Sequence, residues 1–387
     1  MSLENVEKKL VLIGVNYWFI DSFQHYIDNG FKLFVIKTKT PNHYLKNYNI
    51  CEELGAKIVD YTDIESIKSV IDFDKNTIVL SGGDYSGEIK TLQFIRENSE
   101  LELEILHQLS KYCNQKRTKT QFVRYFNGDT GWGDEKNAIA FEKKIEYVQN
   151  LCFDNDLLLE FVEQNIPSVK TKNILIGWMH TPLSKFVVKN DTLPSKKIIS
   201  LGRHICSDEL CEVDFTSYPS LKPNTTSRNF YCMAGGAESI RILQQERKQF
   251  YEDNGSYTFG LSYMSDIFSG SYEKFKINKK YYFSNEGQLE FDNPKSTYEL
   301  YYGFINTPSK DANYMMNGII PLISHDFTST YKELLNNKMA ILIKTKKDLV
   351  DLRNIPDHTI LEYKNNIFKN KQIYTFETIA NKIIKLI

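Results

Sequence analysis

The sequence DANYMMNGIIPLIS, at residues 311–324, shows the pattern of structural elements that recurs through much of the chain. A helical pattern opens this stretch, Asn317-Gly318 interrupt it, and an apolar run that includes Pro321 follows at positions 319–323. Asn or Gly just past the end of a helix favours a left-handed cap, and an apolar run bounded by turn residues is typical of a buried strand in a parallel sheet. The stretch therefore predicts a helix, a tight cap and a core strand, the repeating unit of an α/β protein.

Strands and helices alternate in the same way through the first half of the chain. Helices are expected to end at Gly30 and Gly55, and strands are predicted from the apolar runs at residues 10–14, 31–36, 57–61 and 77–81. Such alternation implies parallel pairing with right-handed crossovers, so a Rossmann-like domain is expected. The turn after its first strand, GVNYW, lacks the G-x-G-x-x-G pattern, which speaks against a dinucleotide bound in the usual way.

Length and composition suit a cytoplasmic protein with two domains. The chain has 387 residues, which fits two domains of roughly 150 to 200 residues each. Its 48 basic and 49 acidic residues leave a net charge of -1, so the charge does not point to nucleic acid. Six scattered cysteines without a C-x-x-C pair predict reduced thiols and no structural metal site. No apolar run approaches about 18 residues, which predicts a cytoplasmic location with peripheral contact at the inner face of the membrane left open.

Two loops in the first half contain polar residues that are candidates for ligand binding. The first, SGGDYSG at residues 81–87, contains Asp84 and follows a predicted strand at its carboxyl end, where open sheets bind ligands. The second, NGDTGWGD at residues 127–134, is the densest cluster of Gly and Asp in the chain. Trp132 can stack on a sugar ring while the carboxylates of Asp129 and Asp134 accept hydrogen bonds from its hydroxyls. A plain surface turn is the alternative for each loop.

A junction between the two halves is predicted at about residues 165–195. Residues 172–178 form another apolar strand, His180 follows it, and KNDTLP at residues 189–194 has the polar, proline-closed composition of a linker. His180 is a candidate substrate contact, and a structural or solvated histidine is the alternative.

The second half begins with a fresh strand, KIISLG at residues 197–202, and Arg203 follows it directly. The fork of donors on an arginine can bind phosphate oxygens and offset the charge of a leaving nucleotide. Gly235-Gly236 precede a helix expected at residues 238–251, and the free amides and dipole of a helix N-terminus favour an anion. A salt-bridged surface arginine and an ordinary glycine turn are the alternatives.

This order of features resembles that of the GT-B glycosyltransferases. The resemblance rests on the strand that ends in Gly202-Arg203 and on the helix, glycine step and strand of residues 311–324, and it covers the arrangement of the whole chain. It implies an α/β protein with two Rossmann-like domains facing across a cleft. The implied units are an N-terminal acceptor domain at residues 1–190, a C-terminal nucleotide-sugar donor domain at 191–370, and a last helix at 371–387 that crosses back to the N-terminal domain.

The resemblance also implies two sets of binding residues. Those expected to bind the donor are Arg203, His204, Gly235, Gly236, Tyr263, Asn313, Asn317 and Gly318. Those expected to bind the acceptor are Asn16, Trp132 and His180.

The chain departs from the commonest retaining members of that family, which carry two Glu eight positions apart before a Gly-x-Pro step. Ile305 and Asn313 stand at those positions, and the step from Gly318 to Pro321 is one residue longer. Retention through that pair is therefore not expected. An inverting reaction needs a general base, for which the candidates are Asp129 first, then Asp134 and Asp84. No D-x-D loop follows a strand in the second half, so we expect catalysis without a metal and without a cofactor, with the nucleotide sugar as a substrate.

The leading hypothesis is a glycosyltransferase that moves a sugar from a nucleotide-sugar donor to a glycan or lipid-linked glycan of a capsule, lipopolysaccharide or glycoconjugate. One alternative is a non-catalytic two-domain protein that binds sugars or nucleotide sugars, which would have little use for Arg203 if its ligand were neutral. The other is a nucleotide-sugar epimerase. The sequence leaves the sugar, the base, the acceptor and the stereochemistry open.

Overall fold

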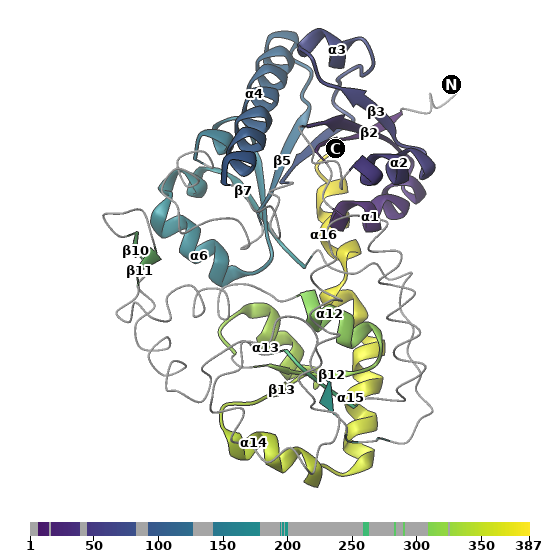
Figure 1. Ribbon diagram of the computed structural model, residues 1–387, viewed down its shortest axis with the longest axis vertical. Coiled ribbons are helices and arrows are strands. Elements are labelled where there is room, and N and C mark those ends of the chain that lie inside the picture. The colour runs from purple at the N-terminus through teal and green to yellow at the C-terminus, as the bar shows by residue number, and fades with distance from the viewer. Residues whose placement is uncertain are drawn as a thin grey trace.

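The computed structural model describes two parallel β-sheets and the helices around them. The described residues are 7–14, 17–38, 45–82, 92–126, 142–178, 194, 196, 198–199, 258–262, 282–283, 289–290, 309–323 and 326–387. Within them the chain is a mixed α/β protein, and the two sheets lie in separate halves of the molecule (Figure 1).

Seven parallel strands form the first sheet in the described part of the chain, in the order β3-β2-β1-β4-β5-β6-β7. The order reverses at β1, which pairs with β2 on one side and with β4 on the other. This is the order of a doubly wound, Rossmann-like sheet, in which ligands bind outside the carboxyl ends of the strands near the reversal. The strands are β1 (Lys8–Ile13), β2 (Phe31–Lys37), β3 (Lys57–Asp60), β4 (Thr77–Ser81), β5 (Gln121–Phe126), β6 (Asn150–Phe153) and β7 (Asn173–Ile176).

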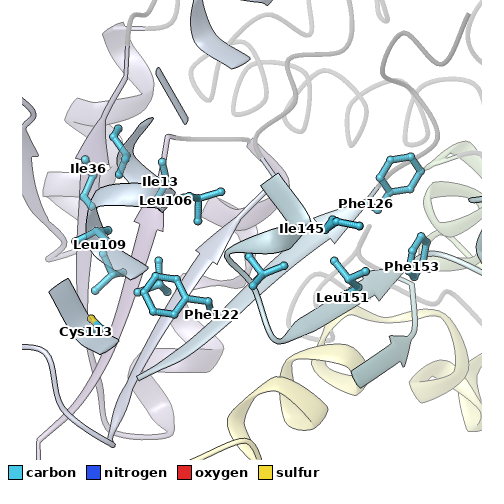
Figure 2. Packing of buried hydrophobic residues seen from close by; sticks show 14 of the residues in the cluster. Ile13, Ile36, Leu106, Leu109, Cys113, Phe122, Phe126, Ile145, Leu151 and Phe153 are labelled. Atoms are coloured by element: carbon cyan, nitrogen blue, oxygen red, sulfur yellow. The ribbon is translucent and has the colours of Figure 1, made fainter. Parts of the chain in front are cut away.

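Helices cover both faces of the first sheet because successive side chains of its buried strands point to opposite faces. Val11 and Ile13 of β1 point to the face covered by α3 (Ile64–Lys68), α4 (Leu92–Lys116) and α6 (Asp156–Asn165). Figure 2 shows this core, in which Leu106, Leu109 and Cys113 of α4 share a cluster with Phe122 of β5.

The other face of the first sheet packs against helices from both ends of the chain. Leu10 and Leu12 of β1 point to α1 (Tyr17–Asp28), α2 (Leu45–Glu53) and α16 (Phe376–Ile384). Full burial of each such leucine stabilises the fold by about 1.5–3 kcal/mol.

Four short parallel strands form the second sheet in the described residues, in the order β13-β12-β9-β8. They are β8 (Ile198–Ile199), β9 (Phe259–Leu261), β12 (Ile320–Ile323) and β13 (Ile341–Leu342). The helices and 3-10 turns that follow or flank these strands are α12 (Ser309–Met316), α13 (Ser329–Asn336), α14 (Lys346–Asp351), η6 (Leu352–Asn354), α15 (Asp357–Lys369) and η7 (Lys371–Tyr374). An antiparallel pair, β10 (Tyr282–Phe283) and β11 (Leu289–Glu290), is separate from both sheets.

The helix, cap and strand predicted at residues 311–324 are confirmed over the described residues 311–323. The amide of Gly318 donates to the carbonyl of Met315 at 3.0 Å, and the amide of Ile319 donates to the carbonyl of Tyr314 at 2.9 Å. These two bonds form a Schellman motif, and Gly318 has the left-handed φ of 66° that the motif needs. The chain then enters β12, all of whose residues are buried.

Pro321 is accommodated in the middle of the second sheet by the register of its neighbours. The amide of Ile320 points to β9, where it donates to the carbonyl of Thr258 at 2.9 Å. Position 321 therefore faces β13, whose pairing with β12 begins only opposite Leu322. The missing N–H of Pro321 thus costs the sheet no ladder bond.

Two chain segments connect the first sheet to the core of the second, and they lie against each other. Trp178 follows β7 but is buried in the second core, where its ring makes an edge contact with Tyr374 at a centroid distance of 6.2 Å. After Tyr374 the chain returns to the first sheet as α16, beside α1 (Figure 1). Gly177 lies against Ile379 of α16, and the Nζ of Lys382 donates to the carbonyl of Ile176 at 2.6 Å.

Candidate functional site

The carboxyl ends of β1, β4 and β5 define the candidate site in the first sheet, because the strand order reverses between β1 and β4. β4 leads into residues 83–91, here called segment A, and β5 leads into residues 127–141, called segment B. Segment A contains Asp84, and segment B contains Asp129, Trp132 and Asp134. Both segments lie outside the described residues, so the site is built below from the residues that adjoin them.

Gly82 marks the closest backbone approach at this edge. Its φ is 132°, and a Cβ placed on it would lie 2.4 Å from the carbonyl oxygen of Tyr125. A side chain at this position would be both strained and in collision with the backbone of β5. Gly82 therefore lets the chain leave β4 in direct contact with β5, immediately before segment A.

Three buried charged side chains meet beside Gly82, on the face of the sheet covered by α4. Glu102 of α4 accepts a hydrogen bond from Arg124 of β5, with 2.6 Å between Oε1 and Nη1. Its other oxygen, Oε2, accepts from the Nζ of Lys144 at 2.5 Å. The amide of Gly82 also donates to Oε1, at 3.2 Å. At exposures of 6% for Glu102 and 1% for each cation, these contacts are far less screened than surface ion pairs.

A second polar contact lies at the same edge on the opposite face of the sheet. The hydroxyl of Tyr125, on β5, donates to the carboxylate of Asp154, the residue that follows β6. Asn155 comes next and caps α6, its side chain accepting from the amide of Leu158 at 2.8 Å. All three polar side chains are buried, so the carboxyl edge holds ordered polar groups on both faces of the sheet.

The carboxyl edge of the second sheet carries a buried tyrosine and aspartate. Tyr331, in the first turn of α13, donates its hydroxyl to Oδ2 of Asp311, in the first turn of α12, at 2.6 Å. Burial, followed by the negative charge of Asp311, raises the pKa of Tyr331 well above its ordinary value, so the phenol is neutral. The contact joins the N-termini of two helices beside Ser262, which follows β9.

The carboxyl sides of the two sheets are in direct contact. Oδ1 of Asp156, the first residue of α6, accepts from the amide of Ser329, the first residue of α13, at 2.7 Å. Phe327, which follows β12, packs in the core of the first sheet. The carboxylate of Asp156 is favourable at the N-terminus of α13. Together the two contacts link the carboxyl end of each sheet to the other half of the molecule.

Most of the site residues predicted from the sequence lie outside the described part of the chain. They are Asp84, Asp129, Asp134, Asn16, Trp132, His180, Arg203, His204, Gly235, Gly236 and Tyr263. Asn313 lies on α12, and Asn317 and Gly318 end that helix. Asn317 and Gly318 therefore lie at the amino end of β12, whereas Tyr331 and Asp311 lie at its carboxyl end.

The described residues form neither a metal-binding cluster nor a membrane-spanning helix. Within them, no group of three or more His, Cys, Asp or Glu side chains is arranged to hold a metal ion. None of the helices in this part of the chain is long and apolar enough to cross a membrane.

Comparison with known proteins gives similarity in structure only. No protein-family model matches the chain, and no curated protein matches it in sequence. TarM is similar over 100% of this chain and 99% of its own, with a TM-score of 0.52 and 8% sequence identity. HepE from Anabaena, solved in complex with UDP and glucose, is similar over 98% of this chain and 99% of its own, with a TM-score of 0.45 and 8% identity. The lactate dehydrogenase of Eimeria maxima matches 42% of this chain and 49% of its own, with a TM-score of 0.26 and 12% identity.

The likeness to TarM decides the fold. TarM is a glycosyltransferase of the GT-B type, and the match spans both chains from end to end. The chain therefore has a glycosyltransferase-like fold.

Proposed function

We propose that the chain moves a sugar from a nucleotide-sugar donor to a glycan acceptor. The observation that carries the proposal is the glycosyltransferase-like fold, which extends over the full length of this chain and of TarM. Because one fold can host many activities, the function also depends on a suitable site. The carboxyl edges of two parallel sheets are the places where open α/β sheets bind ligands.

In this proposal the two sheets belong to two Rossmann-like domains, residues 1–190 and 191–370, that face each other across a cleft. Residues 371–387 cross back to the first of them. The bond between Asp156 and Ser329 supports the arrangement, because it brings the carboxyl sides of both sheets to one region. A donor on one side and an acceptor on the other would then meet without a large movement of the chain.

The donor is assigned to the second domain. Arg203 and the amides around Gly235 and Gly236 would neutralise the diphosphate as it leaves, so that no metal is required. His204, Tyr263 and Asn313 complete the proposed donor site. Asn317 and Gly318 are left out of it, because they lie at the amino end of β12, opposite the carboxyl edge.

The acceptor is assigned to the first domain, with Asn16, Trp132 and His180 as its binding residues. Asp129 would take the proton from the acceptor hydroxyl as the new bond forms, and Asp134 and Asp84 are the alternatives. The acceptor is a glycan or a lipid-linked glycan, which would bring the protein to the inner face of the membrane.

Binding of the donor is tested by thermal unfolding of the purified protein with UDP, GDP, CMP and their sugar conjugates. Selective binding to the folded state stabilises it by about 2.7 kcal/mol at a hundredfold excess over Kd. We expect one nucleotide family to raise Tm and Arg203→Ala to abolish that rise. If none raises Tm at millimolar concentration, a donor activated by UDP, GDP or CMP is ruled out, and a binding protein or a lipid-phosphate donor is favoured instead.

Transfer is tested with the donor so identified and a panel of octyl glycosides as acceptors. Release of nucleotide should depend on the acceptor and persist in EDTA. Asp129→Asn should lower kcat by about 10²–10⁴-fold, the usual contribution of a general base, while leaving the donor-induced rise in Tm intact. Stabilisation without nucleotide release would favour a binding protein, and conversion of the donor sugar to its epimer would favour an epimerase.

A further inference from the structure

The two halves of the molecule meet where α6 and α13 begin, away from the segments in which the chain crosses between them. Oδ1 of Asp156 accepts a hydrogen bond from the amide of Ser329 at 2.7 Å. Phe327, two residues before Ser329, packs in the core of the first sheet and is only 9% exposed. In Figure 1, α6 and α13 lie to the left of α15 and α16, between which the chain crosses back. Asp156, Phe327 and Ser329 are called the clasp below, and the crossing is the pair of segments that contain Trp178 and Tyr374.

Each side of the clasp is rigid within its own half of the molecule. In the first half, Asp156 directly follows Asn155, whose side chain caps α6. In the second half, Thr328 caps α13 by accepting from the amide of Tyr331 at 3.1 Å, and the hydroxyl of Tyr331 donates to Asp311 of α12 at 2.6 Å. Because both sides are fixed within their own helices, the contact between them can form or break without rearrangement inside either half.

The clasp is easier to break than the crossing. Asp156 is half-buried and Ser329 is exposed, so water can replace their hydrogen bond. At the crossing the chain itself is continuous, and Trp178 and Tyr374 are fully buried against each other. Regions with few buried contacts open first, and domains rotate about the few residues that connect them. A movement that separates the two halves would therefore release the clasp and pivot at the crossing.

We propose that Asp156, Phe327 and Ser329 form a releasable clasp that holds the carboxyl sides of the two sheets together and opens about the crossing. Its consequence for turnover rests on the proposed function, in which the donor and the acceptor bind at these two carboxyl sides. The closed clasp brings the two bound substrates together, and the open clasp lets substrates enter and products leave. Opening of this kind sets kcat in many enzymes whose substrates bind between two domains.

The first test locks the clasp with a disulfide. Asp156→Cys combined with Ser329→Cys replaces a 2.7 Å hydrogen bond, which brings the two residues within the range that a disulfide can span. Asp63→Cys combined with Ser66→Cys is the matched control, because Oδ1 of Asp63 accepts from the amide of Ser66 at 2.9 Å inside the first half. Mass spectrometry verifies the disulfide in each oxidised protein.

Oxidation of the clasp pair should lower the rate of transfer to the octyl glycoside used above by roughly 10-fold or more. Dithiothreitol should restore the rate, and the control pair should keep its rate whether oxidised or reduced. If the oxidised clasp pair turns over as fast as its reduced form, the halves do not have to separate and the inference is overturned.

The second test weakens the clasp and needs no activity. Asp156→Ala removes one hydrogen bond, which should raise the ratio of open to closed molecules by roughly 2- to 10-fold. Amide hydrogen exchange in peptides covering residues 154–160 and 326–332 should accelerate by the same factor. Phe327→Ala removes the aromatic contact and should accelerate exchange further, with a larger radius of gyration in X-ray scattering. Asp63→Ala, which breaks the same kind of bond inside one half, should leave exchange in these peptides unchanged.

The two tests separate the clasp from the proposed function. If the wild-type chain transfers no sugar, the proposed function fails, and exchange with scattering alone decides whether the clasp holds the halves together. Asp156→Ala leaves the buried side chains in place, so its result stands even if Phe327→Ala fails to fold. Exchange in the two peptides that is no faster in Asp156→Ala than in Asp63→Ala overturns the inference.

Discussion

Gly82 has no room for a side chain at the carboxyl edge of the first sheet. Gly82→Ala places a methyl group 2.4 Å from the carbonyl oxygen of Tyr125, at a φ of 132°. Backbone strain and overpacking together should lower the free energy of unfolding by roughly 3 kcal/mol or more. Urea denaturation measures this loss directly.

Gly55→Ala is the control for backbone conformation alone. Gly55 has a left-handed φ of 87°, but a Cβ placed on it meets no atom within 4 Å. We expect a loss of only about 1–2 kcal/mol, the usual cost of a left-handed alanine. Equal losses for the two variants would show that the contact with Tyr125 does not constrain position 82.

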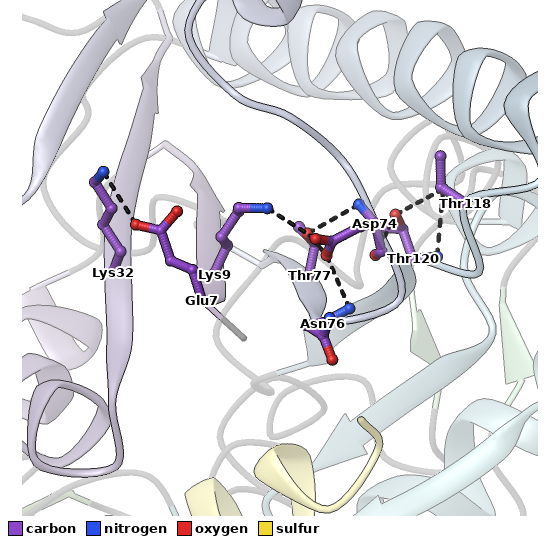
Figure 3. A network of polar contacts seen from close by, with 8 residues as sticks. All are labelled: Glu7, Lys9, Lys32, Asp74, Asn76, Thr77, Thr118 and Thr120. Atoms are coloured by element: carbon purple, nitrogen blue, oxygen red, sulfur yellow. Dashed lines mark hydrogen bonds and ion pairs between the residues drawn. The ribbon is translucent and has the colours of Figure 1, made fainter. Parts of the chain in front are cut away.

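Asp74 should make stability depend on pH in the acidic range. Burial alone would raise the pKa of its carboxyl, but hydrogen bonds from Lys9, Thr77 and the amide of Asn76 outweigh burial and lower it (Figure 3). A carboxyl with a lowered folded-state pKa stabilises the fold fully above its unfolded pKa of about 3.9. The stabilisation disappears as the pH falls through the folded-state value.

Urea unfolding of the wild type and of Asp74→Asn between neutral and acidic pH tests this linkage. The difference in unfolding free energy should be constant from neutral pH down to about pH 5 and should shrink below about pH 4, as Asp74 protonates in the wild type. A difference that stays constant down to the acid limit of folding would show that the carboxyl is not held in its charged form.

At the scale of elements, α12 and β9 are fitted together through one glycine. Gly260 does not have a left-handed backbone, yet a Cβ on it would lie 2.4 Å from the ring of Tyr314, which is fully buried on α12. Gly260→Ala should therefore cost roughly 1–3 kcal/mol by overpacking alone. Because the clash is with one ring, the cost should vanish in the background of Tyr314→Ala, and a double-mutant cycle measures the coupling. Additive losses would place the constraint elsewhere.

Sequence patterns predict elements well where apolar runs end in glycine. The strand at residues 77–81 and the caps at Gly30, Gly55 and Gly318 agree with the structure, because a continuous apolar run and a glycine with a left-handed backbone are signals contained in neighbouring residues. The same patterns do not predict α4, β5 or α15. α4 carries its apolar signal at Ile105, Leu109 and Cys113, spaced as on one face of a helix, among many charged residues.

β5 is hard to predict from the sequence for a different reason than α4. Its sequence QFVRYF places Arg124 in the middle of a buried strand, which speaks against a core strand until a partner for the charge is known. That partner, Glu102, is 22 residues away in the sequence, and Lys144 is 42 residues from Glu102. No local pattern contains such a contact, so the buried charges beside segment A could not be predicted. The residues of segments A and B stay predictions from composition and position.

At the scale of the whole molecule, the last helix joins the two halves. Its amphipathic pattern can be predicted from the sequence. Which of the two cores its apolar face packs into cannot, because this depends on contacts with distant residues. Residues before it, including Tyr374, belong to the core of the second sheet, whereas Phe376, Ile379 and Ile383 belong to that of the first. The chain thus changes cores within two residues. This connection makes the stability of the face beside α1 depend on the last residues of the chain.

Ile379→Ala tests that dependence. Ile379 is fully buried, lies against Gly177 after β7, and shares a cluster with Phe23 and Tyr26 of α1. The truncation should cost roughly 2–4 kcal/mol, and amide hydrogen exchange should rise in α1 and β7, because these elements lose their cover. Exchange in α15, which packs in the other core, should change least.

Ile367→Ala on α15 is the matched control, because it removes the same atoms from an equally buried site in the core of the second sheet. Its effect on exchange should be the reverse, with faster exchange in α15 and β12 and little change in α1. If both variants accelerate exchange uniformly over the two sheets, the cores unfold as one unit. A local response to each would mean that the two sheets keep separate stabilities, as two bodies joined through Trp178 and Tyr374 should.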